Sequence, residues 1–416
     1  MSAERLNQII RLLESESLEE RKSAADTLSE LGMNGLSREE GLIALRGATK
    51  TFPQRDSDYW DSASDLVIAA GRYPTPDYVP VIRELFPEYS KKSRVEAVRL
   101  LASVKERSAA VALMSIIDEH ARSGGIHELA IHSLQDDPRH ADIFFPNILD
   151  YTDVPAFEWD IYLLCLKYLQ AELIHGVDLM RYSSRVIESY RKYKFQLRSA
   201  QQANGIAWMW EENYRKCREM CCLLLDLFGY VPTPAIEKEI REASSYSDPK
   251  IILFAALSIL RHGKEINPQI IFKVARSAEV RSTLYEELDK LNRSSLFPNK
   301  YWTDEAFAES NLVRWLAFPT ELDRVPDEIE LMKVVSLKSD SSIAPMDYYV
   351  FRFRTHEPHW SAKDGWMAGI SGPVPRDDAD SDMLYRDTFS QFEPWDNKAP
   401  EEHVNQILGI TCGHRT

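Results

Sequence analysis

Residues 247–263, SDPKIILFAALSILRHG, decide the fold of this 416-residue chain. Asp248 and Pro249 predict a helix start, because an Asp side chain caps the first backbone N–H groups and Pro suits the first helical turn. Ala256 and Leu260 lie four positions apart and therefore share one helix face. The small residue lets a neighbouring helix approach closely, and the Leu fills the space beside it. The segment thus predicts a helix that stacks against other helices.

The same pair of a small residue and a Leu recurs in the first third of the chain. Its small members are spaced by 38, 35 and 33 residues and are Ala24, Ser62, Ala97 and Ala130. A two-helix unit repeated every 35 to 40 residues is typical of an α-solenoid, in which each unit packs only against its neighbours. The sequence therefore predicts a helical array over residues 1–320, with Ser37 as one helix cap and a helix over residues 126–137.

These units resemble HEAT-type repeats. The residues that carry the resemblance most clearly are Asp248 with Pro249 and Asn267 with Pro268, which open two successive helices. The resemblance covers about residues 5–315 and implies a HEAT/ARM-like α–α superhelix. Two longer helices, over residues 177–202 and 206–229, interrupt the regular spacing within an irregular section at about 155–230. A non-repeating helical bundle is the alternative.

Beyond residue 320 the pattern changes from helical to alternating. In DYYVFRFRT, residues 347–355, Phe351 and Phe353 share one strand face and Arg352 and Arg354 the other. We expect further strands over 329–337 and 365–373, and a final helix after Pro400. The 329–337 strand is expected to place on one side Ile329, Leu331, Val335 and Leu337. Residues 321–416 therefore predict a small α+β domain that caps the array, covered by its last helix or by the final segment.

The bulk composition restricts the function. Lys and Arg total 50 against 65 Asp and Glu, which gives a net charge of −15 and disfavours nucleic-acid binding over the whole surface. The first residues, MSAERLNQII, lack the pattern of a signal peptide, and the most apolar run is too short to span a membrane. Five cysteines without framework spacing favour a reducing compartment. We expect a cytoplasmic protein.

Two histidine motifs are candidate metal sites. In HELAIH, His127 and His132 lie five positions apart, so on a helix their imidazoles diverge and cannot share one zinc as an i, i+4 pair can. In HEPHWSAKD, His356 and His359 with Asp364 could form a metal-dependent active site in the end domain. This enzyme hypothesis stays as an alternative, but the sequence predicts neither a metal nor another cofactor.

Two further motifs fit structural roles better than catalysis. GISGP resembles the G-x-S-x-G nucleophile elbow around Ser371, but Pro373 replaces the last Gly and no helix pattern follows. Cys217, Cys221 and Cys222 could hold a soft metal, yet they lie in a stripe where Cys acts as a small apolar residue. The sequence predicts no catalytic residue.

The stretch 181–198, RYSSRVIESYRKYKFQLR, is the one basic patch. Its six cations face a single Glu and are Arg181, Arg185, Arg191, Lys192, Lys194 and Arg198. Tyr182, Tyr190, Tyr193 and Phe195 are interleaved with them and could stack on bases. Nucleic-acid binding through this stretch is therefore a second alternative.

A protein-binding scaffold or adaptor is the function that the sequence favours. Solenoids offer long surfaces to proteins and peptides, and the predicted partner contacts are Arg191, Lys194, Trp208, Arg352, Arg354, Trp360 and Trp366. The repeats together with residues 365–373, GWMAGISGP, are similar to bacterial HEAT-repeat proteins of unassigned function. That resemblance implies, as a special case, an immunity protein that neutralises a toxin, and the acidic charge suits a nuclease toxin.

Overall fold

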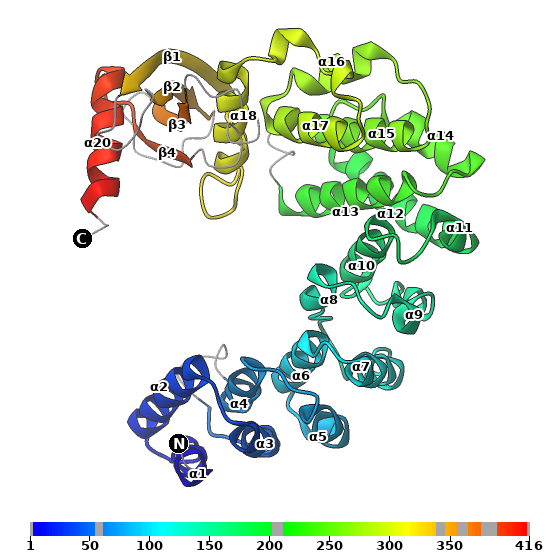
Figure 1. Ribbon diagram of the computed structural model, residues 1–416, viewed down its shortest axis with the longest axis vertical. Coiled ribbons are helices and arrows are strands. Elements are labelled where there is room, and N and C mark those ends of the chain that lie inside the picture. Colours follow the sequence, from blue (N-terminus) through cyan, green and yellow to red (C-terminus); the bar gives the residue numbers. More distant parts are fainter. Residues whose placement is uncertain are drawn as a thin grey trace. The chain divides into compact units, whose positions relative to one another are not determined.

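The computed structural model describes residues 3–54, 61–201, 211–337, 346–355, 365–375 and 389–413. Contacts between residues divide the chain into two compact units, Met1–Leu179 and Met180–Thr416. The predicted fold class is confirmed, because the chain is mainly helical and ends in a small antiparallel sheet with helices beside it (Figure 1). The predicted domain boundary at residue 320 is not tested by this division and stays a prediction.

The first unit consists of helices in two rows. Its helices are α1 (Ala3–Leu13), α2 (Leu18–Asn34), α3 (Arg38–Gly47), α4 (Ser62–Gly71), α5 (Tyr78–Leu85), α6 (Lys91–Ser103), α7 (Arg107–His120), α8 (His132–Asp136), α9 (Ala141–Phe144), α10 (Glu158–Gln170) and α11 (Gly176–Leu179). The odd-numbered helices from α1 to α9 pack successively against one another, and so do the even-numbered helices from α2 to α10. Two rows packed neighbour to neighbour fit an α-solenoid.

The small residues of the repeated pairs explain how one of these rows packs. Ala24, Ser62 and Ala97 are buried in α2, α4 and α6, which are successive members of the even row. The backbones come close enough that a Cβ added to Gly32 of α2 would lie 3.3 Å from the Cα atom of Ala69 in α4. Small side chains are therefore needed where these helices meet.

The predicted cap at Ser37 is confirmed, whereas one predicted helix is wrong. Ser37 and Glu40 form a complete capping box at the start of α3, as expected for this residue pair. The predicted helix over 126–137 is wrong, because only His132–Asp136 is helical. The chain from Ile126 to Ile131 is not helical but still buries both of these side chains. The apolar side chains of this segment are therefore buried although the segment is not a helix.

The second unit continues with paired helices. They are α12 (Ser183–Gln201), α13 (Glu212–Phe228), α14 (Pro234–Ala243), α15 (Pro249–Arg261), α16 (Pro268–Ala275), α17 (Ala278–Lys290) and α18 (Asp304–Leu316). Helices α13, α15 and α17 pack in succession. Helix α13 also contacts α12 and α14, α15 contacts α14 and α16, and α17 contacts α16. The two long helices predicted for the middle of the chain correspond to α12 and α13, which pack against each other.

Buried charges link the successive helices of this unit. Asp248 caps α15 by accepting hydrogen bonds from the backbone N–H groups of Lys250 and Ile251. Its second oxygen accepts a 2.7 Å hydrogen bond from the Tyr214 hydroxyl of α13, and Arg218 of α13 lies 3.8 Å away. Asp248 is fully buried. The residue that predicted a helix start therefore also joins two helices.

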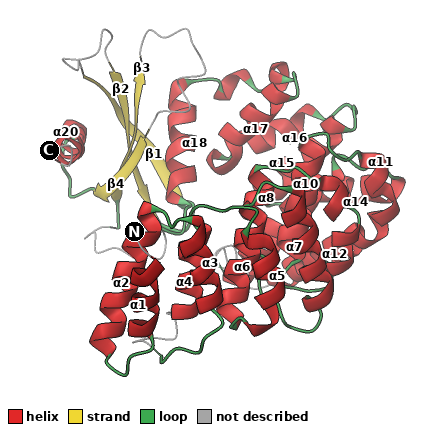
Figure 2. Cartoon of the chain, turned by 60° about the horizontal axis from the view of Figure 1, so that its bottom comes forward, coloured by secondary structure: helices red, strands yellow, loops and turns green. Residues whose placement is uncertain are grey.

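The sheet lies between two helices. Its strands follow the order β1 (Glu328–Leu337), β2 (Met346–Arg354), β3 (Met367–Pro375) and β4 (Phe389–Pro394), all antiparallel. Phe351 and Phe353 pack with Leu312 of α18 on one face, whereas Val350 packs with Val404 of α20 (Pro400–Gly413) on the other. Figure 2 shows α18 and α20 on opposite sides of the strands. The alternation predicted for β2 is thus confirmed, and both predicted covers are present.

One prediction about the strands is wrong, and one strand was missed. A bulge between Leu331 and Lys333 reverses the alternation of β1, so that Ile329 packs on the α18 side and Val335 and Leu337 pack on the α20 side. The four apolar residues of this strand therefore do not share a face, since an extra residue shifts every later side chain to the opposite side. The fourth strand, β4, was not predicted.

Candidate protein-interaction surface

An arginine–tryptophan surface forms at one end of the sheet, on the face that α20 also contacts. It consists of Arg352, Arg354, Trp366, Glu328 and Glu330. The Cζ atoms of Arg352 and Arg354 lie 4.5 and 4.8 Å from the centre of the Trp366 ring. Arg352 donates from Nε and Nη2 to Glu330 at 2.8 and 2.6 Å, and Arg354 donates likewise to Glu328 at 2.9 and 2.5 Å. Each guanidinium is thereby fixed by a carboxylate and a ring.

The strand register produces this arrangement. Antiparallel pairing places Glu328 opposite Arg354 and Glu330 opposite Arg352, and opposite charges in such cross-strand pairs stabilise a sheet. Three of the predicted partner contacts, Arg352, Arg354 and Trp366, are therefore brought together. The two glutamates were missed, although their alternation in EIEL is the signal that could have found them.

The surface is both ordered and accessible. The side chains of Arg352 and Arg354 are 33% and 42% exposed. Within the described ranges, neither guanidinium forms another hydrogen bond. The Nη1 groups therefore donate to neither Glu328 nor Glu330. Holding a long side chain in place before binding reduces the conformational entropy that a partner must overcome. Such a surface can bind carboxylates, backbone carbonyls or aromatic rings.

The predicted contacts Arg191 and Lys194 lie elsewhere, on α12, where they bind α14. Arg191 Nε lies 2.8 Å from one oxygen of Glu239, and Lys194 Nζ lies 2.5 Å from the other. Lys194 also lies 3.1 Å from Glu242, which in turn pairs with Arg198. These cations therefore help to hold α12 against α14, which fits the alternative that the basic residues of 181–198 pair with acidic neighbours.

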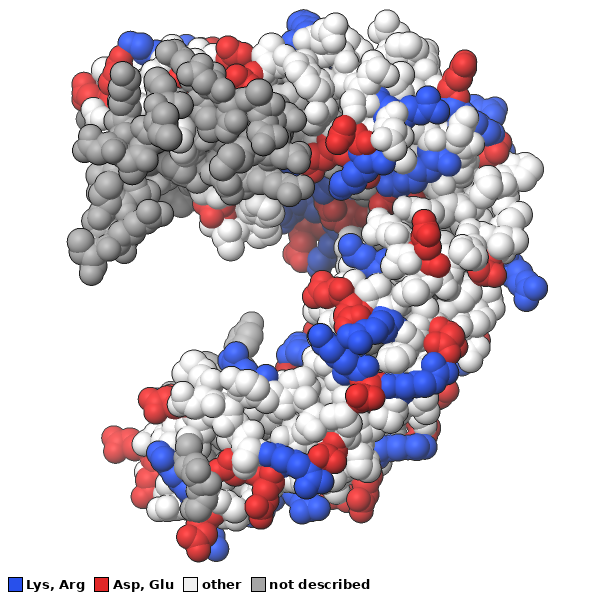
Figure 3. Space-filling model, viewed as in Figure 1, with Lys and Arg blue, Asp and Glu red and all other residues white. Residues whose placement is uncertain are grey.

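The aromatic residues of the basic stretch do not form a stacking row. Tyr190 is fully buried, and this burial raises the pKa of its hydroxyl. Tyr182 and Tyr193 are half-buried, whereas Phe195 is 72% exposed. Figure 3 shows Lys and Arg interspersed with Asp and Glu over the face in view. Nucleic-acid binding gains no support from this geometry, because a sequence of exposed rings is what stacks on successive bases.

The α12–α14 contact predicts a pH-dependent stability. Burial raises the pKa of Glu239, but hydrogen bonds from Lys194 and Arg191 outweigh this effect and hold the pKa below its usual value. The carboxylate therefore stabilises the fold above its unfolded pKa of about 4.3, and this contribution is lost as the pH falls through the lower folded pKa. We expect Glu239→Gln to lower the free energy of unfolding by about 2 kcal/mol at neutral pH, with a smaller loss in acid.

Urea unfolding at neutral and acidic pH measures this difference. Glu237→Gln is the matched control on the same helix, because its exposed pair with Lys264 contributes little. A loss for Glu239→Gln that is independent of pH, or no larger than that of the control, would contradict the assignment.

Several predicted residues lie outside the described part of the chain. Among the partner contacts these are Trp208 and Trp360. The three residues of the enzyme hypothesis, His356, His359 and Asp364, also fall outside the described ranges. In the parts of the chain that are described, no three His, Cys, Asp or Glu side chains are grouped as a metal site would require. The metal-dependent enzyme therefore remains untested.

The other chemical motifs have structural roles. Ser371 is fully buried within β3, which continues to Pro375, so no strand–turn–helix elbow presents its hydroxyl. Cys217, Cys221 and Cys222 are buried in α13. Burial raises the pKa of each of these thiols. They are therefore poor thiolate ligands or nucleophiles.

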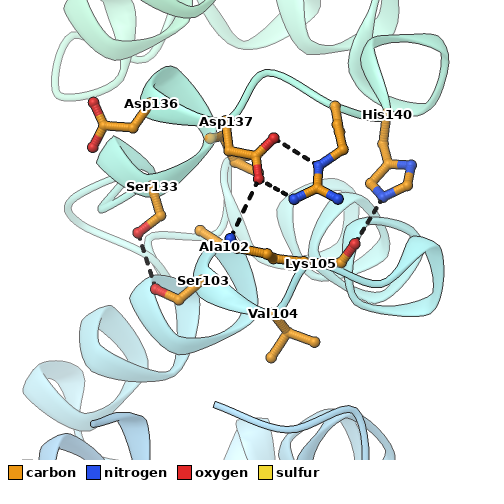
Figure 4. Close-up of a pocket in the computed structure, with 10 residues that line it drawn as sticks. Ala102, Ser103, Val104, Lys105, Ser133, Asp136, Asp137 and His140 are labelled. Carbon is orange, nitrogen blue, oxygen red and sulfur yellow. Dashed lines mark hydrogen bonds and ion pairs between the residues drawn. The ribbon is translucent and has the colours of Figure 1, made fainter. Parts of the chain in front are cut away.

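A pocket of about 470 Å³ in the first unit was not predicted (Figure 4). It lies between the end of α6 and the segment around α8, and its charged groups other than Asp136 bind one another. Asp137 pairs with Arg139 and lies 3.9 Å from Lys105 Nζ, while His140 Nε2 lies 3.2 Å from the Lys105 carbonyl. These mutual contacts already occupy the polar groups of Asp137, Arg139 and His140 that a polar ligand would need. The pocket therefore does not indicate a reaction.

Comparisons with known proteins do not place this chain in a family. No family, no curated protein and no solved structure matches it. Within the described residues, no helix combines the length and the apolar character that crossing a bilayer requires.

Proposed function

We propose that this chain is a protein-binding scaffold whose partner contacts the arginine–tryptophan surface. The observation that carries the proposal is the pair of half-exposed guanidiniums, Arg352 and Arg354, held over Trp366 by two glutamates. Arg and Trp are the residue types most enriched among the side chains that dominate binding energy at protein interfaces. A paired and stacked arginine keeps its donors in place for a partner.

We further propose that the array is HEAT-like. Support comes from the Asp248 and Asn267 caps, each followed by Pro at the first helical position, and from helices packed neighbour to neighbour in rows. A narrower proposal is that the chain is an immunity protein of bacterial type acting in the cytoplasm. The net charge of −15 supports it, because an acidic protein attracts a basic nuclease.

Replacement of the stacked ring tests the scaffold proposal. We expect Trp366→Ala to lower the affinity for captured partner protein at least about tenfold, since removing a central aromatic contact costs about 2 kcal/mol or more. The measurement is affinity capture from cells with quantitative mass spectrometry, followed by titration of the recovered partner. Arg354→Gln keeps the ring and should also weaken binding, although less.

Two variants of the first unit control for non-specific effects. Trp159→Ala removes another exposed Trp, and Arg107→Ala breaks an exposed ion pair with Asp142. Both should retain the partner fully. If the Trp366 and Arg354 variants, folded as judged by thermal unfolding, bind as well as the controls, the proposed surface is wrong.

A further inference from the structure

The outer side of α12 is a second exposed surface with a distinct chemistry. We define the α12 basic face as Arg191, Lys192, Phe195 and Arg198. Phe195 is 72% exposed, more than any other large apolar side chain in the described part of the chain. It lies three positions from Lys192 and from Arg198, and four from Arg191, so all four share one side of the helix. An apolar ring is thus surrounded by three cations.

The carboxylates that pair with Arg191 and Arg198 lie beneath this face, whereas the exposed Glu188 lies one turn before Arg191 on the same side of the helix. The Glu239 side chain is 3% exposed and that of Glu242 is 33% exposed. Their arginine partners, Arg191 and Arg198, remain 54% and 51% exposed. A molecule approaching from solvent therefore meets these cations and the ring before it meets Glu239 or Glu242.

We propose that the α12 basic face binds an acidic segment of the partner protein whose apolar side chains cover Phe195. This inference rests on the proposed scaffold function and names a second contact. The face is positive although the chain carries −15, so an acidic segment is directed to it and repelled by most other surfaces. Covering the exposed ring removes apolar area from water, which supplies affinity that charge alone does not.

The same geometry favours a protein segment over nucleic acid. A single-stranded nucleic acid needs several exposed rings along a basic groove, and here Tyr190 is buried while Phe195 alone protrudes. The exposed Glu188 beside the face disfavours a continuous row of phosphates, whereas a peptide can place its acids selectively.

A random peptide library displayed on phage tests the proposal with the full-length chain. We expect the wild-type protein to enrich peptides that combine Asp or Glu with aromatic or aliphatic residues. Phe195→Ser and Lys192→Glu, both changes at exposed side chains, should each weaken the enriched peptides at least about tenfold. The matched controls are Val111→Ser, a change at another exposed apolar residue, and Lys290→Glu, a change at another exposed cation; both should bind like the wild type.

The outcomes are separable. The inference is overturned if no enriched peptide depends on Phe195 and Lys192 for binding, or if the enriched peptides are basic. Binding of a mixed-sequence single-stranded oligonucleotide is measured by fluorescence anisotropy. The inference is also overturned if the oligonucleotide binds the wild-type protein more tightly than the peptides do and loses this binding in both variants. If Trp366→Ala abolishes partner capture while the Phe195 and Lys192 variants retain it, this inference fails and the proposed scaffold function stands.

Discussion

Asp248→Ala is expected to lower the free energy of unfolding by about 4 kcal/mol, the largest loss of the single changes considered for this chain. The substitution removes a helix cap, which costs about 1 kcal/mol. It also leaves the buried Tyr214 hydroxyl without its acceptor and takes one carboxylate from the buried Arg218. Removing one partner of a buried charge pair typically costs about 3 kcal/mol or more.

Asn267→Ala is the matched control for this prediction. Asn267 caps α16 through the backbone N–H of Gln269 and precedes Pro268 as Asp248 precedes Pro249, but it is exposed and contacts no buried charge network. We expect a loss of about 1 kcal/mol in urea unfolding followed by circular dichroism. Equal losses for the two variants would show that Asp248 acts as a cap alone.

Arg281→Met is expected to lower the free energy of unfolding by about 3 kcal/mol. Arg281 is 3% exposed and donates to the carbonyl of Ala275 at 2.8 Å, to the carbonyl of Ala306 at 2.5 Å and to Glu309 at 2.7 Å. It therefore joins the end of α16 to α18 through α17. Met fills much of the volume but supplies no donor, so buried carbonyl groups lose their partners.

The neighbouring exposed residue Arg276 provides the comparison. Arg276→Met should change the unfolding free energy by less than about 0.5 kcal/mol, because exposed substitutions away from special features rarely matter more. A small effect of Arg281→Met in the same urea titration would mean that α17 and α18 are held by apolar packing alone.

Much of the helical architecture was predictable because its determinants are local. Ser37 and Asp248 cap helices through side chains that reach only the next few N–H groups. Ala24 and Ala97 mark the row of helices because close packing requires small residues at a regular spacing. Such signals can be recognised from one short segment of sequence alone.

Features that depend on distant partners were not predictable in the same way. The bulge after Leu331 is defined by pairing with β2, and it moved Val335 to the opposite face from Ile329. The apolar spacing of residues 126–131 suggested a helix, but these side chains are buried by neighbouring elements without one. In both places, tertiary contacts override the local period.

The candidate surface was half predictable for the same reason. Strand alternation placed Arg352 and Arg354 on one face, and the stacking of Trp366 on them follows from the adjacent strand. Nothing in residues 181–198 revealed that Arg191 would bind Glu239, which lies 48 positions away on another helix. The basic stretch therefore predicted a binding patch, whereas Arg191 and Lys194 form ion pairs within the fold.

Hydrogen exchange of the full-length chain, with and without its captured partner, locates the bound surface along the sequence. On binding, we expect slowed exchange at the end of β2 that carries Arg352 and Arg354 and around Trp366 immediately before β3, and no such slowing with Trp366→Ala. Protection confined to other elements, with these strands unchanged, would contradict this expectation.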